Sequence, residues 1–90
     1  MISLSYFHKD EEYVISTGAC RGGNSPENQA GKQFFQDKDC RERCNINSMC
    51  TSFVLPVSGA NWCETHTSIG ATGNGNTAYT CYMKNGNVIS

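Results

Sequence analysis

The sequence predicts a small α+β domain that is stabilised by disulfide bonds. Three observations support this fold class: the chain has 90 residues, it contains six cysteines, and a helix-forming segment lies among several short strand-forming segments. A chain of this length buries a smaller fraction of its surface than an average domain does, and only 38% of its residues are hydrophobic. Disulfide bonds supply stability to such chains and persist in oxidising compartments. We therefore expect an extracellular or cell-surface protein.

Two strands and a long loop are expected before the helix. Residues 3–7 and 13–17 (YVIST) are rich in β-branched and aromatic side chains, and the charged residues 8–12 separate them. Residues 18–32 collect glycine, Asn, Ser and Pro, which indicates a surface loop around the first cysteine. Loops of this length are often functional.

The helix is expected at residues 37–45 (DKDCRERCN). Asp37 and Asp39 suit the positive end of the helix dipole, and the interior residues tolerate a helix well. Cys40 and Cys44 are four residues apart, so on a helix their sulfur atoms point in nearly the same direction. Because two such cysteines would bridge each other poorly, we expect each to reach a different strand.

Three strands and one loop are expected after the helix. Residues 51–57 (TSFVLPV) have strand chemistry, with Pro56 at a sheet edge or at the end of the strand. Residues 62–66 (WCETH) form the next candidate strand, and the glycine-rich residues 70–76 a loop. Residues 78–84 (AYTCYMK) are the clearest strand, and the Asn-Gly pair that follows them is a strong turn signal.

The balance of charges favours no class of partner. Seven Lys and Arg residues oppose eight Asp and Glu residues, which gives a formal net charge of -1. A nucleic-acid surface needs clustered positive charge, whereas Asp39 and Glu42 interrupt the run of Lys38, Arg41 and Arg43. We therefore expect a solvated helix face there and no nucleic-acid partner.

The first seven residues (MISLSYF) lack the basic start, the long apolar stretch and the cleavage site of a signal peptide. No other segment approaches the ~20 apolar residues of a membrane-spanning helix, so we expect no membrane insertion. Since the cysteines still indicate export, we expect the chain to be one domain of a larger secreted or surface protein.

The spacing of the cysteines is distinctive, although spacing alone leaves their pairing open. A helical C-x3-C is followed by C-x5-C and then Thr-Ser-Phe, and the first and last cysteines lie in Gly-Ala-Cys-Arg and Thr-Cys-Tyr-Met-Lys. The six positions are Cys20, Cys40, Cys44, Cys50, Cys63 and Cys81. Over about residues 13–84 this pattern resembles the PAN/apple domain family.

The resemblance implies an antiparallel sheet that cradles one α-helix. It also implies nested disulfide bonds, with the pairs Cys20–Cys81, Cys40–Cys63 and Cys44–Cys50. The domain would span residues 13–84, after an N-terminal strand and linker at 1–12 and before a C-terminal tail at 85–90. Each bridge would contribute about 2–4 kcal/mol, the longest loop contributing most.

Neither a catalytic site nor a metal site is expected. No combination of nucleophile, base and orienting group is recognisable, and bridged cysteines cannot serve as nucleophiles. Structural zinc sites favour C-x2-C knuckles, which this chain lacks. His66 stays only a candidate surface contact, because isolated histidines are most often solvated or hydrogen-bonded. We expect no cofactor.

These observations predict a non-catalytic module that mediates adhesion or recognition, with a protein or glycan ligand, as the resemblance implies. Aromatic and arginine side chains are the usual anchors of interfaces, and Trp62 with its polar neighbours is the cluster that would suit a sugar. Trp62 serves equally well as a cover for the small core, and we favour a protein ligand slightly. The candidate ligand-binding residues are Trp62, Asn61, Glu64, Arg21, Tyr79 and Tyr82.

Two alternatives of different classes stay open. The first is a structural module that self-associates in an extracellular matrix or coat. The second is a secreted inhibitor or effector, although no rigid reactive loop is recognisable in the sequence.

Overall fold

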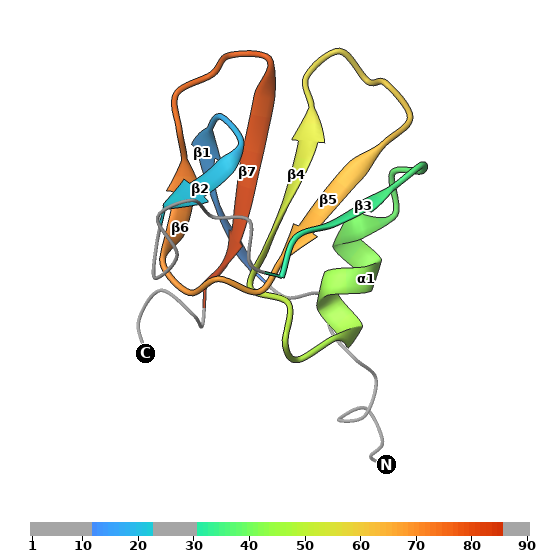
Figure 1. The fold of residues 1–90 in the computed structure, drawn as a ribbon, viewed down its shortest axis with the longest axis vertical. Coiled ribbons are helices and arrows are strands. Elements are labelled where there is room, and N and C mark those ends of the chain that lie inside the picture. The colour runs from blue at the N-terminus through green and yellow to red at the C-terminus, as the bar shows by residue number, and fades with distance from the viewer. Residues whose placement is uncertain (1–11, 23–30, 86–90) are drawn as a thin grey trace.

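The computed structural model describes residues 12–22 and 31–85, which form seven strands and one helix (Figure 1). The strands pair antiparallel in a five-stranded sheet of order β1-β7-β4-β5-β3 and a two-stranded sheet of β2 and β6. This arrangement confirms the α+β prediction of an antiparallel sheet with one helix. The elements are β1 (Tyr13–Thr17), β2 (Cys20–Gly22), β3 (Gln33–Phe35), α1 (Cys40–Ile46), β4 (Ser52–Pro56), β5 (Cys63–His66), β6 (Ala71–Gly73) and β7 (Tyr79–Lys84).

The register of the strands divides the side chains of the large sheet between two faces. Val54 in the central strand β4 lies opposite Glu64 of β5 and Cys81 of β7, so these three residues share one face. Its neighbour Phe53 lies opposite Tyr82 and points to the other face. The first face is covered in part by the pair β2–β6, and we call it the ribbon face. The second is covered by α1, and we call it the helix face.

Each face carries a small core in which cysteines are prominent. On the ribbon face the buried cluster consists of Ala19, Cys20, Val54, Ala71 and Cys81. On the helix face it consists of Cys40, Cys44, Cys50, Phe53 and Cys63. Because six of the ten buried apolar side chains among the described residues are cysteines, disulfide bonds fill much of both cores.

The three bridges join Cys20 to Cys81, Cys40 to Cys63 and Cys44 to Cys50, in agreement with the pairing that the family resemblance implies. The expectation that both helical cysteines reach strands is only half right. Cys40 bridges to β5, whereas Cys50 precedes β4. The chain turns back directly after α1, with the Cys50 N–H donating to the oxygen of Asn47 (3.0 Å), and this turn brings Cys50 to Cys44.

The helix begins at Cys40 and not at Asp37. The carboxylate of Asp37 instead accepts hydrogen bonds from the backbone N–H of Asp39 (2.9 Å) and from Nη2 of Arg43 (3.0 Å). Asp37 therefore forms a turn before the helix and fixes the side chain of Arg43, which lies in the second turn of α1. Pro56 lies at the last position of β4, a central strand, so of the two predicted places for this proline the strand end is correct.

Two segments that the sequence assigned to loops contain strands. The predicted loop 18–32 includes β2, and the glycine-rich loop 70–76 includes β6. The two strands pair with each other, with Arg21 opposite Thr72, so each is stabilised by a partner about fifty residues away in sequence. The short strand β3 was not predicted. The predicted strand at 3–7 and the end of the Asn-Gly turn lie outside the described residues.

Candidate functional site

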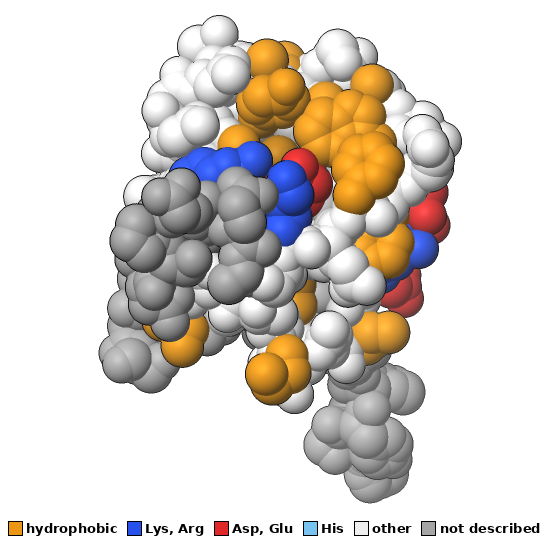
Figure 2. Space-filling model, in the orientation of Figure 1, with side chains coloured by type: hydrophobic (Ala, Val, Ile, Leu, Met, Phe, Trp, Pro, Cys, Tyr) orange, Lys and Arg blue, Asp and Glu red, His pale blue; other side chains and the backbone are white. Residues whose placement is uncertain are grey.

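A group of aromatic and charged side chains lies on the ribbon face, beside the pair β2–β6. Figure 2 shows Lys or Arg side chains and an acidic side chain next to large hydrophobic ones on this side of the molecule. We call the group the aromatic–charged patch. It consists of Arg21, Lys32, Phe34, Trp62, Glu64 and Tyr79.

Strand alternation explains why these residues meet. Trp62 precedes β5 by one residue and Glu64 lies within it, so both side chains point to the ribbon face. Phe34 of β3 is the direct cross-strand partner of Glu64, which places its ring on the same face. Tyr79, at the start of β7, has the same orientation as Cys81, and β2 brings Arg21 over this face.

The aromatic part of the patch is a continuous row of three rings. Phe34 stacks on Trp62 with 5.7 Å between ring centroids, and Trp62 meets Tyr79 edge-on at the same separation. Trp62 and Tyr79 are half-buried and pack against the ribbon-face core, whereas Phe34 remains 55% exposed. Trp62 therefore covers the core, as one of its two predicted roles requires, and it also supports the exposed ring of Phe34, while its role in ligand binding stays a prediction.

Glu64 is the centre of the charged part. One carboxylate oxygen, Oε1, lies 3.1 Å from Nε2 of His66 and 3.7 Å from Nη1 of Arg21, and the other lies 3.8 Å from Nζ of Lys32. The hydrogen bond with His66 lowers the pKa of Glu64 below its usual 4.5, and the charges of Lys32 and Arg21 act in the same direction, against the effect of burial. An ionised carboxylate is only an acceptor, so Nε2 of His66 carries the hydrogen.

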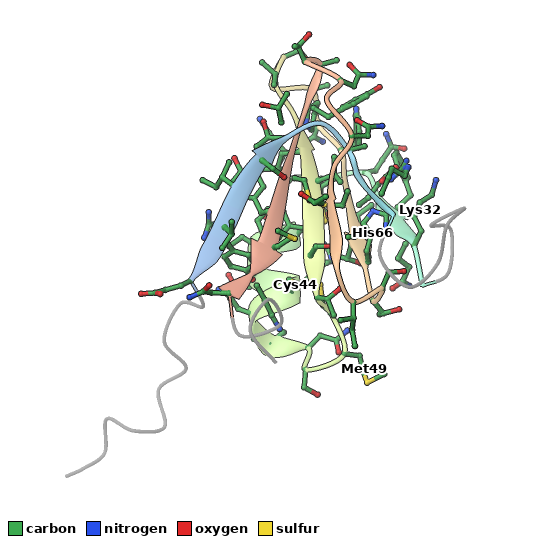
Figure 3. The ribbon with its side chains drawn as sticks, turned by 90° about the vertical axis from the view of Figure 1, so that its left-hand side faces the viewer. Lys32, Cys44, Met49 and His66 are labelled. Atoms are coloured by element: carbon green, nitrogen blue, oxygen red, sulfur yellow. A yellow bond between two sulfur atoms is a disulfide. The ribbon has the colours of Figure 1, made fainter. Side chains whose placement is uncertain are left out.

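His66 is completely buried, so the expectation of a surface contact is wrong. Its strand position places it on the ribbon face, opposite Ser52 of β4, which is also buried. Lys32 and His66 both contact Glu64, and Figure 3 shows the two on the ribbon-face side of the molecule. Within the described part of the chain, neither Nδ1 of His66 nor the hydroxyl of Ser52 has a hydrogen-bond partner. Ser52, His66 and Glu64 are residue types of a hydrolytic triad, but the serine is buried and does not bond to the histidine.

The structure brings together four of the six candidate ligand-binding residues. Arg21, Trp62, Glu64 and Tyr79 belong to the patch. Tyr82 lies on the helix face, where its ring stacks on Phe53 at 4.7 Å between centroids. Strand alternation predicts that Tyr79 and Tyr82 point to opposite faces of β7, but it does not identify the face that carries the patch.

Asn61 is exposed next to Trp62, but its side-chain amide donates to the backbone oxygen of Gln36 (3.0 Å) and ties the loop before β5 to the end of β3. Two members of the patch, Lys32 and Phe34, were missed because they lie in or beside β3, a strand of three residues. The adjacent aromatics Phe34 and Phe35 were the available signal, since on a strand one of two neighbours must point away from the helix.

Apart from the patch, a depression of about 450 Å³ lies on the helix face at the end of α1. Its lining mixes amide, hydroxyl and apolar groups, namely Gln33, Phe35, Arg43, Ile46, Asn47, Ser48, Cys50 and Thr65. Its one charged side chain, Arg43, already lies 3.9 Å above the ring of Phe35 and bonds to Asp37, so the lining of this depression holds no uncommitted cation.

Comparison with known proteins adds no relative. No protein-family model matches the chain, no curated protein matches its sequence and no solved structure matches its fold. The described residues contain no helix that is both long and apolar enough to cross a membrane. Over the same ranges, no cluster of His, Cys, Asp and Glu side chains has the arrangement of a metal site.

Proposed function

We propose that the chain is a non-catalytic, PAN/apple-like binding module of a secreted or cell-surface protein, and that it recognises a protein or carbohydrate ligand through the aromatic–charged patch. The observation that carries this proposal is the exposed ring of Phe34, stacked on Trp62 and directly adjacent to the ion pairs of Glu64. Aromatic and arginine side chains in such surroundings dominate the binding energy of many interfaces.

The chemistry of the cysteines supports the extracellular and non-catalytic parts of the proposal. All six are bridged and all are buried. Disulfide frameworks of this density belong to oxidising compartments, and an oxidised cysteine has no thiolate with which to attack a substrate. The covalent framework instead fixes the sheet on which the patch is displayed.

Phe34→Ala tests the proposal. The wild-type domain, with its disulfide bonds intact, is screened on a printed glycan array and against a displayed library of random peptides. We expect the ligands it selects to bind Phe34→Ala about ten-fold or more weakly, since central aromatic anchors are worth about 2 kcal/mol.

The matched control for Phe34→Ala is Ile46→Ala, which removes another exposed apolar side chain (67%) from the end of α1. This variant is expected to bind like wild type. If the selected ligands tolerate Phe34→Ala and lose affinity for Ile46→Ala, the patch is not the binding site.

Self-association is a second candidate function, supported by other exposed apolar side chains. Ile46 and Met49, each 67% exposed, lie at the end of α1 and in the turn that follows it. Figure 3 shows Met49 projecting from this turn. A self-assembling module would form oligomers at high concentration in size-exclusion chromatography, and Ile46→Asp would return it to a monomer. A monomer at all concentrations would refute this alternative.

A further inference from the structure

We propose that the ligand of the aromatic–charged patch is an acidic segment of a partner protein, in which a carboxylate side chain lies close to an apolar one. This inference rests on the proposed function of the patch. It follows from three properties of the site: an excess of positive charge, uncommitted hydrogen-bond donors, and the short distance between the cations and the exposed ring.

The patch has more positive than negative charge, although the chain as a whole has a formal net charge of -1. Two cations, Arg21 and Lys32, flank the single carboxylate of Glu64. Their side chains are 28% and 33% exposed, whereas that of Glu64 is only 12% exposed. A partner therefore meets the cations first, and a negative group would complement the remaining charge.

Among the described residues, few acceptors engage the donors of these two cations. Oε1 of Glu64 accepts its hydrogen bond from His66, while Arg21 and Lys32 stay at 3.7 and 3.8 Å, too far for hydrogen bonds. Arg21 uses Nη1 to donate to the oxygen of Cys20 (2.7 Å), and Lys32 makes no hydrogen bond to any described residue. A ligand carboxylate can therefore gain charge-assisted hydrogen bonds from both without displacing Glu64 from His66.

The exposed ring lies close to these charges, because Lys32 is two residues before Phe34 in the chain and Glu64 lies on the neighbouring strand. Phe34 is the cross-strand partner of Glu64, and neighbouring strands are ~4.8 Å apart. An extended peptide rises ~3.3 Å per residue, so a carboxylate near Lys32 and an apolar side chain on Phe34 would be about one or two residues apart.

The same contacts favour a peptide over a sugar. Sugar sites need polar groups that bond hydroxyls beside the stacking ring. Near Phe34 and Trp62, Nδ2 of Asn61 already donates to the oxygen of Gln36, and Oε1 of Glu64 already accepts from His66. The groups left for a ligand are the exposed ring of Phe34 and the cations Arg21 and Lys32. A peptide with an apolar side chain next to an acidic one can contact all three.

The test is a selection of displayed random peptides on the oxidised domain, followed by affinity measurements with the synthetic winners. We expect enrichment of peptides in which Asp or Glu lies within two residues of an aliphatic or aromatic residue. Arg21→Gln and Lys32→Gln should each weaken the winning peptide about ten-fold, because a charge-assisted hydrogen bond is lost. Raising the salt concentration should weaken binding to wild type as well.

A double-mutant cycle tests whether Lys32 contacts the acidic residue of the peptide directly. Changing the acidic residue of the peptide to its amide should weaken binding to wild type but have little further effect on Lys32→Gln. The matched controls are Arg41→Gln and Lys38→Gln, which remove the same charges near α1 and should leave affinity unchanged. Unfolding curves of all variants ensure that lost affinity does not reflect lost structure.

Failure of the acidic-peptide inference and failure of the proposed function would give different experimental results. Peptides that depend on Phe34 but are neutral, or that tolerate both glutamine variants, would overturn the acidic ligand and leave the proposed function standing. Binding of glycans carrying glucuronic acid, with no peptide selected, would replace the peptide by an acidic sugar. If neither screen yields a ligand that depends on Phe34, the proposed function falls, and this inference with it.

Discussion

Glu64 is the residue that connects the surface of the molecule to its interior. Its carboxylate faces Arg21 and Lys32 on the outer side and accepts a hydrogen bond from the buried His66 on the inner side. The pKa of Glu64 is lowered first by the bond to His66. The ionised form of this carboxyl group therefore stabilises the folded state, in which it also positions the two cations of the patch.

This arrangement predicts a dependence of stability on pH. Because the pKa of Glu64 in the folded state lies below its usual 4.5, the stabilisation is present above that value and is lost as the pH falls through the folded pKa. Glu64→Gln should remove this part of the acid sensitivity and lower the free energy of unfolding at neutral pH by about 1–2 kcal/mol. Urea unfolding at neutral pH and at steps below 4.5 measures both effects.

Glu42→Gln, on the exposed side of α1, is the matched control and should keep the acid sensitivity of wild type. Wild type and Glu64→Gln losing stability in parallel below the usual glutamate pKa would contradict the assignment. Asp37 also has a lowered pKa, through its hydrogen bond with Arg43, but it lies on the surface where solvent screens the pair.

The sequence of residues 62–66 predicts the orientation of the side chains but not their burial. Alternation along residues 62–66 correctly places Trp62, Glu64 and His66 on one face. It does not reveal that His66 is fully buried while Trp62 is only half-buried. Burial depends on what covers the face, and the cover comes from segments distant in sequence.

At the level of elements, the pair β2–β6 depends on a close approach of two backbones. Gly73 of β6 donates its N–H to the hydroxyl of Ser16 in β1 (2.8 Å). A Cβ atom at position 73 would lie 2.0 Å from the backbone oxygen of Thr17, which also accepts the N–H of Gly75 (2.9 Å). Only glycine lets β6 lie against β1 in this way.

Gly73→Ala should therefore lower the free energy of unfolding by about 2–3 kcal/mol, because a rigid backbone atom must move. The comparison variant is Gly59→Ala, where a Cβ atom meets nothing within 4 Å and only the positive φ of 85° opposes alanine. That variant should cost about 1 kcal/mol. Chemical unfolding of both variants measures the difference, and equal losses would show that the approach of β6 to β1 relaxes freely.

The three strands that the sequence does not predict, β2, β3 and β6, escape prediction for the same physical reason. β2, β3 and β6 have three residues each, too few for alternation to be visible, and β2 and β6 contain glycine, which is rare in strand interiors. Their stability comes from pairing across the chain, as between Arg21 and Thr72. The longer strands β1, β4, β5 and β7 and the helix carry their own pattern and were predicted to within a few residues.

At the level of the whole molecule, we expect the disulfide bonds to contribute different amounts to the free energy of unfolding. Cys20 and Cys81 are 61 residues apart, whereas Cys44 and Cys50 are separated by 6. The four sulfur atoms are almost equally buried, so replacing either pair with alanine removes a similar apolar volume. The main difference between the two replacements is the entropy of the loop that each bridge closes.

We expect Cys20→Ala with Cys81→Ala to lower the free energy of unfolding by about 4 kcal/mol, and Cys44→Ala with Cys50→Ala by about 2 kcal/mol. Thermal and urea unfolding of the two double variants, with the remaining bridges verified by peptide mapping, measures the order. A larger loss on removing the short bridge would contradict it and would assign the stability to local packing around α1.

The long bridge also determines how the molecule responds to mechanical force. The chain enters the described fold at Glu12 and leaves it at Asn85, whose N–H donates to the oxygen of Glu12 (2.8 Å). Tension applied at these points peels β1 from β7 one hydrogen bond at a time until it reaches the covalent bond between Cys20 and Cys81. Every residue of the aromatic–charged patch lies between these two cysteines in sequence. Once tension reaches this bridge, the force passes through it, so the aromatic–charged patch that we propose as the binding site would carry no load.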